Sequence, residues 1–249
     1  MAACQNRGVS ASQTRPNGSV PTFRRRGGRL GPELRTVLAE VLPRFELPDP
    51  AATGTRWDLD RIFGGRDVVV EVGSGMGEAA LELALARPDE AVIAVDVHVR
   101  GIASLARAAA RSDLDNLRVV LGDGLDVLRE GVAPEALAGI RAWFPDPWPK
   151  ARHHKRRLFS DPNVELMVSR LRPGGTLHAA TDVAEYALVI SDVLDAQPAL
   201  EPIVRGSPRP PWRPWTKYER AGLAAGRPAS DFIYARRPDS TMATHPFRR

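Results

Sequence analysis

The chain has 249 residues, of which 43% are hydrophobic, and a formal net charge of +5, which suits one α/β domain with a substantial core. Its single cysteine, Cys4, excludes an intramolecular disulfide and a cysteine-based metal cluster. No apolar run approaches the roughly 18 residues of a membrane-spanning helix and no apolar secretory signal is present, so we expect a cytoplasmic protein without membrane attachment.

The N-terminal tail, residues 1–31, contains six Arg and no acid, and its Ser, Gly, Pro and Asn content predicts disorder. Residues 205–249 are also basic, with ten Arg or Lys against three acids. Basic ends favour contact with a polyanion such as a nucleic acid. Two alternatives remain for the tail: a merely solubilising segment, since Arg outnumbers Lys by 32 to 3 in the chain, and an organelle transit peptide.

Residues 32–249 are expected to form a single domain, with a short helix at Pro32–Leu42 and the regular core beginning near Trp57. From Asp67 onward, β-branched runs alternate with helical segments. The expected strands are Val68–Val72, Ala91–Val95, Leu117–Leu121, Ile140–Phe144 and Thr176–Ala180, with Asp231–Arg236 as a closing edge strand. The expected helices are Glu78–Ala86, Ile102–Ala110, Val164–Leu171 and Ala184–Leu194. This alternation predicts an α/β fold with a mostly parallel sheet and helices on both faces.

Acidic residues stand at or near the ends of the first five expected strands. Parallel strands bring their carboxyl ends to one edge of the sheet, where ligands bind. We therefore expect these acids to converge on one crevice, although an Asp at such a position also commonly caps a helix. The residues are Glu71, Asp96, Asp123, Asp146 and Asp182.

The glycine-rich segment Glu71–Gly77 follows the first strand and precedes a helix. Gly73, Gly75 and Gly77 would allow the backbone to approach a ligand closely. The dinucleotide pattern needs a third glycine where Glu78 stands, and this carboxylate would repel a pyrophosphate, which disfavours an NAD-dependent oxidoreductase.

A cationic cofactor without phosphate, S-adenosylmethionine, fits this glycine segment better than a dinucleotide. Asp96 is placed to bind the ribose, Asp123 the adenine amino group, and Glu71 the methionine end.

Three prolines stiffen the loop Phe144–Lys150 and would fix Asp146 and Trp148 at the edge of the sheet. A carboxylate beside an aromatic ring suits an enzyme that acts on an exposed base. The basic run after the loop would hold the RNA backbone. Its histidines are adjacent, without the spacing of metal ligands, so we expect no metal. The run comprises Arg152, His153, His154, Lys155, Arg156 and Arg157.

The sequence closely resembles the bacterial tRNA (guanine-N7)-methyltransferase family. The motifs that carry the resemblance are FRRRGGR at Phe23–Arg29, EVGSGMG at Glu71–Gly77, FPDPWPK with RHHKRRL from Phe144 to Leu158, LRPGG with ATD from Leu171 to Asp182, and TKYE at Thr216–Glu219. The family has a basic residue where this chain has Ala151, so one phosphate contact would be absent.

This resemblance implies a Rossmann-like class I methyltransferase fold that acts on guanosine 46 in the variable loop of tRNA and releases S-adenosylhomocysteine. It also implies that Glu71, Asp96, Asp123 and Asp146 line the cofactor side. The residues it places against the substrate are Lys150, Asp182, Thr216, Lys217, Tyr218 and Glu219.

Guanine N7 has a free lone pair, so methyl transfer needs no general base. We assign Asp146 the catalytic role of orienting the guanine and stabilising the positive charge of the product. The partner is tRNA, with no obligate protein partner evident. An RNA-binding scaffold that kept the fold and lost activity is the alternative class of function.

Overall fold

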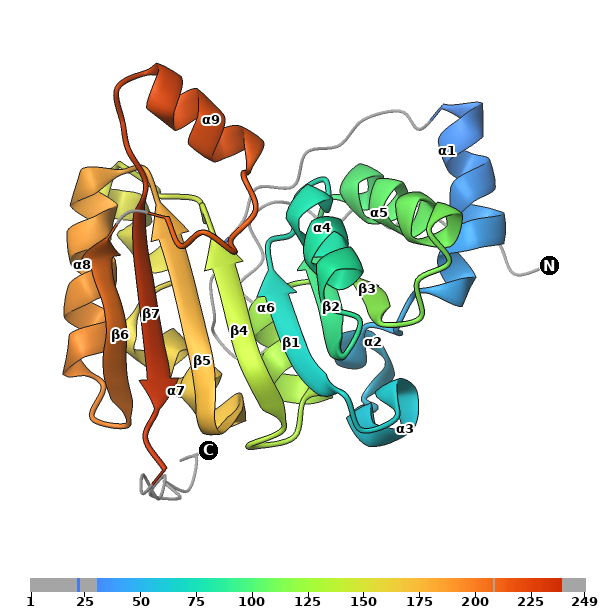
Figure 1. Cartoon of the computed structure of the whole chain (residues 1–249), viewed down its shortest axis with the longest axis horizontal. Helices are drawn as coiled ribbons and strands as arrows, with labels where there is room; N and C mark the ends of the chain where they lie inside the picture. The colour runs from blue at the N-terminus through green and yellow to red at the C-terminus, as the bar shows by residue number, and fades with distance from the viewer. Residues whose placement is uncertain (1–21, 23–30, 208, 239–249) are drawn as a thin grey trace.

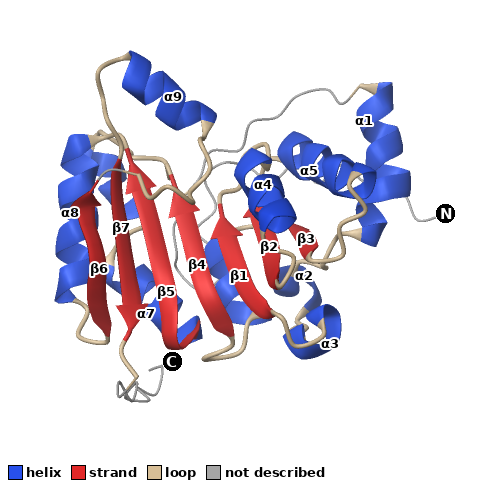
Figure 2. Ribbon diagram, in the orientation of Figure 1, coloured by secondary structure: helices blue, strands red, loops and turns tan. Residues whose placement is uncertain are grey.

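The structure is a computed structural model that describes residues 22, 31–207 and 209–238. Most of the expected disordered tail, including the basic segment Phe23–Arg29, lies outside these residues. The described chain builds one seven-stranded sheet with helices packed on both faces (Figures 1 and 2). This arrangement confirms the fold class expected from the sequence.

The strand order in the sheet is β3-β2-β1-β4-β5-β7-β6. The first five strands are parallel, whereas β7 runs antiparallel to both β5 and β6. The order reverses between β1 and β4, which is the switch point where α/β sheets bind ligands. The strands are β1 (Asp67–Val72), β2 (Glu90–Asp96), β3 (Leu117–Leu121), β4 (Leu137–Trp143), β5 (Leu171–Thr181), β6 (Leu200–Ser207) and β7 (Ser230–Arg236).

The helices range from single turns to 13 residues, the length of α5 and α8, so no described helix is long enough to cross a membrane. A π-helical turn (Val37–Val41) and a 3-10 turn (Leu42–Arg44) continue α1. Another π-helical turn (Val127–Gly131) continues α6, and a 3-10 helix covers Ala151–Arg156. The α-helices are α1 (Pro32–Thr36), α2 (Pro50–Thr53), α3 (Leu59–Phe63), α4 (Glu78–Ala86), α5 (Val99–Arg111), α6 (Gly124–Asp126), α7 (Asp161–Arg170), α8 (Ala184–Ala196) and α9 (Lys217–Ala224).

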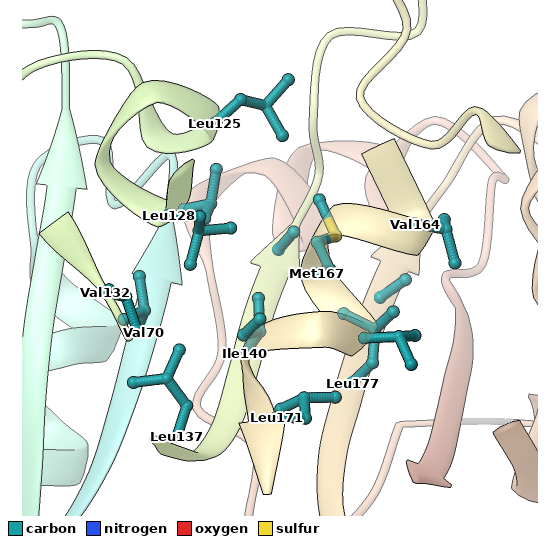
Figure 3. Packing of buried hydrophobic residues seen from close by; sticks show 14 of the residues in the cluster. Val70, Leu125, Leu128, Val132, Leu137, Ile140, Val164, Met167, Leu171 and Leu177 are labelled. Carbon is teal, nitrogen blue, oxygen red and sulfur yellow. The ribbon is translucent and has the colours of Figure 1, made fainter. Parts of the chain in front are cut away.

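The core consists of two layers because successive strand residues point to opposite faces of the sheet. Val92 and Ala94 of β2 pack beneath α4 and α5, whereas Ile93 points to the other face. On that other face, Ile140 and Leu177 meet α7 in a close-packed apolar cluster (Figure 3). Burial on both faces explains why the central strands are continuous apolar runs.

The expected start of the core near Trp57 is wrong. Leu42, Phe45 and Leu47 are all buried, and the backbone of residues 45–47 bonds to Val119 of β3. The Leu47 amide donates to the Val119 carbonyl, and the Val119 amide donates to the Phe45 carbonyl, both at 2.9 Å. Residues 45–47 therefore cover the β3 edge of the sheet, although Pro43 and Pro48 flank them and interrupt regular structure.

The expected closing edge strand is also wrong in its position. β7 lies inside the sheet, and β6, which the sequence patterns did not predict, forms the edge. Pro202 and two register shifts interrupt β6, so its sequence lacks the regular alternation of a strand. Pro is tolerated at this position because edge strands need not donate every ladder hydrogen bond.

Candidate active site

A cleft with a volume of about 550 Å³ opens at the carboxyl ends of β1, β2, β3 and β4, beside the switch point. Its walls contain most of the residues expected to bind a cofactor, together with two residues of the TKYE segment. Glu71, Gly77 and Asp182 do not line it. The expected residues that do are Gly73, Gly75, Asp96, Asp123, Asp146, Lys217 and Tyr218.

The glycine-rich segment makes a tight turn between β1 and α4. Gly73, Gly75 and Gly77 have φ values of 80°, 60° and 81°, a region that side chains rarely allow. A Cβ on Gly77 would also lie 2.6 Å from the Cβ of Leu105 in α5. Gly77 is therefore required by packing, while Gly73 and Gly75 present backbone to the cleft.

Asp96 closes β2 with both carboxylate oxygens bonded to backbone. One accepts from the Gly75 amide and the other from the His98 amide, each at 2.7 Å. Burial raises the pKa of Asp96, and these hydrogen bonds oppose that rise. Each oxygen has a second acceptor position, so the carboxylate holds the glycine turn and can still accept bonds from a ligand.

Glu71 is buried in β1, beneath the glycine turn. Burial raises its pKa to about 7, against the opposing charge of Arg141, and the nearby Asp96 adds to the rise. Its Oε2 atom has no hydrogen-bond partner among the described residues, nor do Ser74 Oγ and Trp143 Nε1, which border the same small cavity of about 40 Å³. This acidic cavity fits a cationic donor such as an ammonium group.

Asp123 caps α6, and its Oδ1 accepts from the Leu125 amide at 2.8 Å. Its neighbours Gly122 and Gly124 also line the cleft, so the turn after β3 presents mainly backbone to the cleft. Asp123 therefore caps a helix, which was the alternative interpretation of the strand-end acids, and it also lines the cleft.

The loop after β4 places Asp146 exposed on the cleft wall, but it buries Trp148. The Trp148 indole donates to the Thr22 carbonyl at 3.0 Å, and the Arg156 guanidinium lies 3.9 Å from its ring centre. Trp148 lines the cleft with only 4% of its surface exposed, so little of its ring is open to a base, and the expected stacking stays a prediction. The same contact brings Thr22 to the cleft.

Lys150 and the basic run that follows it divide by exposure. Lys150, Arg152 and Lys155 are exposed, whereas His153, His154 and Arg156 are half-buried. Arg157 is only 3% exposed, and its guanidinium bonds twice to Glu185, at 2.9 and 2.7 Å, and once to the Pro147 carbonyl. The geometry thus makes Arg157 an anchor of the proline loop rather than a phosphate contact.

The segment TKYE begins α9, which lies above the carboxyl ends of the parallel strands (Figure 1). The Thr216 hydroxyl accepts from the Glu219 amide at 3.1 Å and caps the helix. Lys217 and Tyr218 are exposed on the cleft, whereas Glu219 is buried. The spacing of Thr216 and Glu219 is that of a capping box, a pattern that could have predicted this helix.

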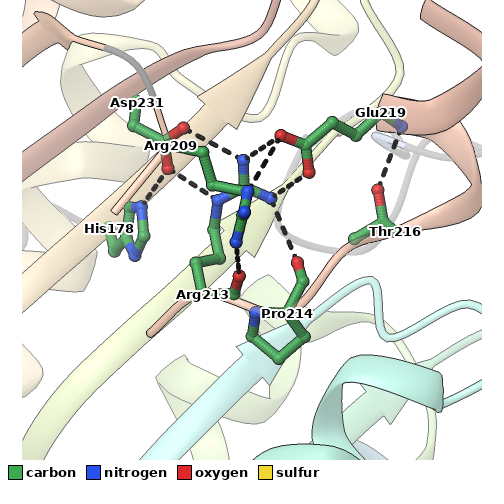
Figure 4. Close-up of polar contacts among 7 residues, drawn as sticks. All are labelled: His178, Arg209, Arg213, Pro214, Thr216, Glu219 and Asp231. Atoms are coloured by element: carbon green, nitrogen blue, oxygen red, sulfur yellow. Dashed lines mark hydrogen bonds and ion pairs between the residues drawn. The ribbon is translucent and has the colours of Figure 1, made fainter. Parts of the chain in front are cut away.

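A buried polar network fixes Glu219 (Figure 4). Arg213 donates to both oxygens of Glu219, each at 2.9 Å, and to both oxygens of Asp231 on β7, at 2.8 and 3.0 Å. His178 of β5 contacts Asp231 at 2.6 Å, and burial lowers the pKa of this histidine even though Asp231 opposes the shift. Arg213 had not been predicted as a site residue, and it ties α9 to the sheet.

Asp182 lies beyond the cleft and pairs with Arg227 at 3.0 Å, just after the C-terminal end of α9. Gly222 of α9 packs so closely that a Cβ there would lie 2.6 Å from the Asp182 carboxylate. The structure therefore brings Asp182 to the back of α9 rather than to the cleft wall.

Comparison with known proteins gives consistent matches. Residues 65–232 match a family described as a putative methyltransferase. The chain is similar to the tRNA (guanine-N(7)-)-methyltransferase of Aromatoleum aromaticum, with 43% identity over 88% of this chain and 84% of that protein. The protein of the same name from Paraburkholderia xenovorans is 41% identical over the same shares of the two chains.

A solved structure, the 16S rRNA methyltransferase KamB, matches with a TM-score of 0.52 at 16% identity, over 74% of this chain and 95% of that one. This likeness concerns the fold alone.

Proposed function

The chain belongs to the tRNA (guanine-N7)-methyltransferase family, and on this basis we propose that it transfers the methyl group of S-adenosylmethionine to N7 of guanosine 46 in the variable loop of tRNA. The observation that carries the proposal is the cleft itself. It joins the glycine turn, the strand-end acids Asp96 and Asp123, and Asp146 in one space, with exposed Lys150 at the end of the loop that carries Asp146.

The cofactor position follows from the polar groups of the cleft. Asp96 accepts from the ribose hydroxyls, Asp123 accepts from the adenine amino group, and the glycine turn approaches the methionine part. The unpartnered carboxylate oxygen of Glu71 supports an ammonium group at the small cavity beside this turn. Charge supports a cationic ligand there, since the described wall of this cavity carries two carboxylates, Glu71 and Glu78, and one cation, Lys217.

S-adenosylmethionine, when bound, would supply an electrophilic methyl group on a cationic sulfur. The N7 lone pair of guanine would form the new bond to this methyl group as the methyl–sulfur bond breaks, leaving the electron pair on S-adenosylhomocysteine, and no proton is transferred. The protein's contribution is therefore orientation and electrostatics. Asp146, held on a stiff loop, orients the guanine edge and stabilises the positive charge that the base acquires. Lys217 and Tyr218 close the other side of the cleft, and Arg213 and Glu219 hold them in place.

We assign the RNA backbone to the exposed cations Lys150, Arg152 and Lys155, with the neighbouring histidines in support. The reaction belongs in the cytoplasm, where tRNA is available. The test is incubation of an unmodified tRNA transcript with the protein and S-adenosylmethionine, followed by mass spectrometry of the nucleosides. The proposal requires 7-methylguanosine; a protein that binds tRNA but forms none is the inactive scaffold.

A further inference from the structure

An exposed aromatic and basic strip runs from Trp212 to Arg220, beside the cleft. Three large rings lie on the surface here: Trp212 is 41% exposed, Trp215 38% and Tyr218 53%. Aromatic side chains of this size are usually covered, and their clustering marks an interaction surface. The strip is separate from the basic run at Arg152–Arg157, which lies on the segment after β4.

The ring of Trp215 is held in a fixed orientation. The Arg209 guanidinium lies 4.2 Å from its ring centre, a distance typical of a cation–π contact. Arg209 also donates to the Arg213 carbonyl and lies 3.6 Å from the Glu219 carboxylate. Since Arg213 and Glu219 are buried, the exposed ring is connected to a rigid support and loses little freedom on binding.

Trp212 differs from the other two rings because it contacts more neighbours. Arg87 lies 4.9 Å from its centre, and His178 packs against it edge-on with the ring centres 5.2 Å apart. Among the described residues, Trp215 and Tyr218 each contact one cation, Arg209 for Trp215 and Lys217 for Tyr218, whose ring centre lies 5.1 Å from the Lys217 ammonium. Trp215 and Tyr218 are therefore the less covered rings of the strip.

Two cations of the strip, Lys217 and Arg220, are exposed, and no acidic side chain among the described residues pairs with them. Lys217 lies against the ring of Tyr218. Lys217 and Tyr218 also line the cleft, so the strip continues directly from the proposed reaction site. Figure 1 shows α9, which carries these two residues, above the carboxyl ends of the parallel strands.

We infer that this strip is a second RNA-contact surface, on which Trp215 stacks with a base of the tRNA next to the target guanosine while Lys217 and Arg220 contact its phosphates. Exposed rings interleaved with cations that lack an acidic partner among the described residues match single-stranded nucleic acid, whose bases stack and whose backbone is anionic. An apolar protein face would leave both cations without a counter-charge. The inference rests on the proposed function and extends it to Trp215 and Arg220, which do not line the cleft.

Steady-state kinetics of Trp215→Ala test this surface. Loss of one base–aromatic stack corresponds to a rise in the KM for tRNA of about 5- to 150-fold, with the affinity for S-adenosylmethionine unchanged. Trp215→Phe should recover most of the loss because it keeps a planar ring. Ile203→Ala, which removes an exposed apolar side chain from β6, is the control and should leave the KM unchanged.

Ionic strength separates the two kinds of contact. The effect of Trp215→Ala should persist at high salt because stacking is uncharged, whereas the effect of Lys217→Gln with Arg220→Gln should shrink as salt rises. tRNA should also quench the tryptophan fluorescence of the wild type more than that of Trp215→Phe. This binding readout does not require turnover, so it tests the surface even if methylation itself were absent.

Three results would overturn the inference. The first is a tRNA KM and a fluorescence response that do not change in Trp215→Ala. The second is a loss of thermal stability in that variant that accounts for the whole kinetic effect and that Trp215→Phe does not restore. The third is a change of oligomeric state with the tRNA KM intact, which would identify a protein partner for the strip.

Discussion

The Arg213 guanidinium donates two hydrogen bonds of 2.9 Å to the Glu219 carboxylate, and the Arg213 side chain is fully buried. Only Glu219 and Gly222 of α9 are buried, so this helix is held mainly by polar anchors rather than by an apolar face. Glu219, which the resemblance places against the substrate, is therefore better described as a positioning residue. It sets the place of Lys217 and Tyr218 over the cleft.

Replacing Arg213 by Met should strongly destabilise the protein, because it leaves the buried carboxylates of Glu219 and Asp231 without their partner. Breaking such a pair costs about 3–5 kcal/mol. Urea denaturation measures the change. Glu219→Gln, which keeps an oxygen that can accept from Arg213, is the matched variant and should lose much less. Equal stability of wild type and Arg213→Met would show that the network is not an anchor.

The pKa of Glu71 should make stability depend on pH. Because its folded pKa is about 7 rather than 4.5, the folded state binds the proton more tightly, and the free energy of unfolding falls as pH rises through this window. Glu71→Gln removes this dependence. Relative to this variant, the wild type should lose about 3 kcal/mol between pH 4.5 and 8. A difference in unfolding free energy that stays constant with pH would mean that Glu71 is ionised throughout.

Asp146→Ala should lower kcat by about 100- to 1,000-fold, the usual cost of losing one group that stabilises transition-state charge. The affinity for S-adenosylmethionine should change far less, since Asp96, Asp123 and the glycine turn remain. Single-turnover methylation and calorimetry measure the two quantities. Normal turnover in this variant would refute the role assigned to Asp146.

Substitutions at Lys150 and in the basic run should have two different effects, one on tRNA affinity and one on stability. Lys150→Gln with Lys155→Gln removes exposed charges, so tRNA affinity should fall and its dependence on log salt should flatten by about 0.7–0.9 per lost phosphate contact. Arg157→Gln should instead lower the melting temperature, because this buried side chain links Glu185 to the proline loop. A salt slope altered by Arg157→Gln without any loss of stability would contradict this division.

The strands and helices that the sequence predicted best are those with long apolar runs and clear ends. Glu78–Ala86 and Leu117–Leu121 have the predicted bounds: Gly77 precedes the helix and Pro88 follows it closely, while Gly122 and Asp123 follow the strand. β6 was not predicted since Pro202 and its register shifts break the alternation, and α9 was not predicted because it buries no apolar stripe. A capping box at Thr216 was the one local sign of α9.

For the site, a rule about strand ends was enough to bring Asp96, Asp123 and Asp146 into one cleft. The rule failed for Asp182, which pairs with Arg227 behind α9. Sequence patterns also missed residues whose roles depend on a distant partner. Arg157 belongs to a basic run, but Glu185 on α8 buries it, and Asp231 on β7 completes the support of Glu219. Such pairings follow from the packing of separate elements, which local patterns do not encode.

The most direct measurement is the position of the methyl group in tRNA. A transcript with guanosine at position 46 and a matched transcript with adenosine there are incubated with the protein and S-adenosylmethionine, and then cleaved chemically at 7-methylguanosine. The account predicts one cleavage, at position 46, in the first transcript and none in the second. Cleavage elsewhere, or equal methylation of both transcripts, would contradict it.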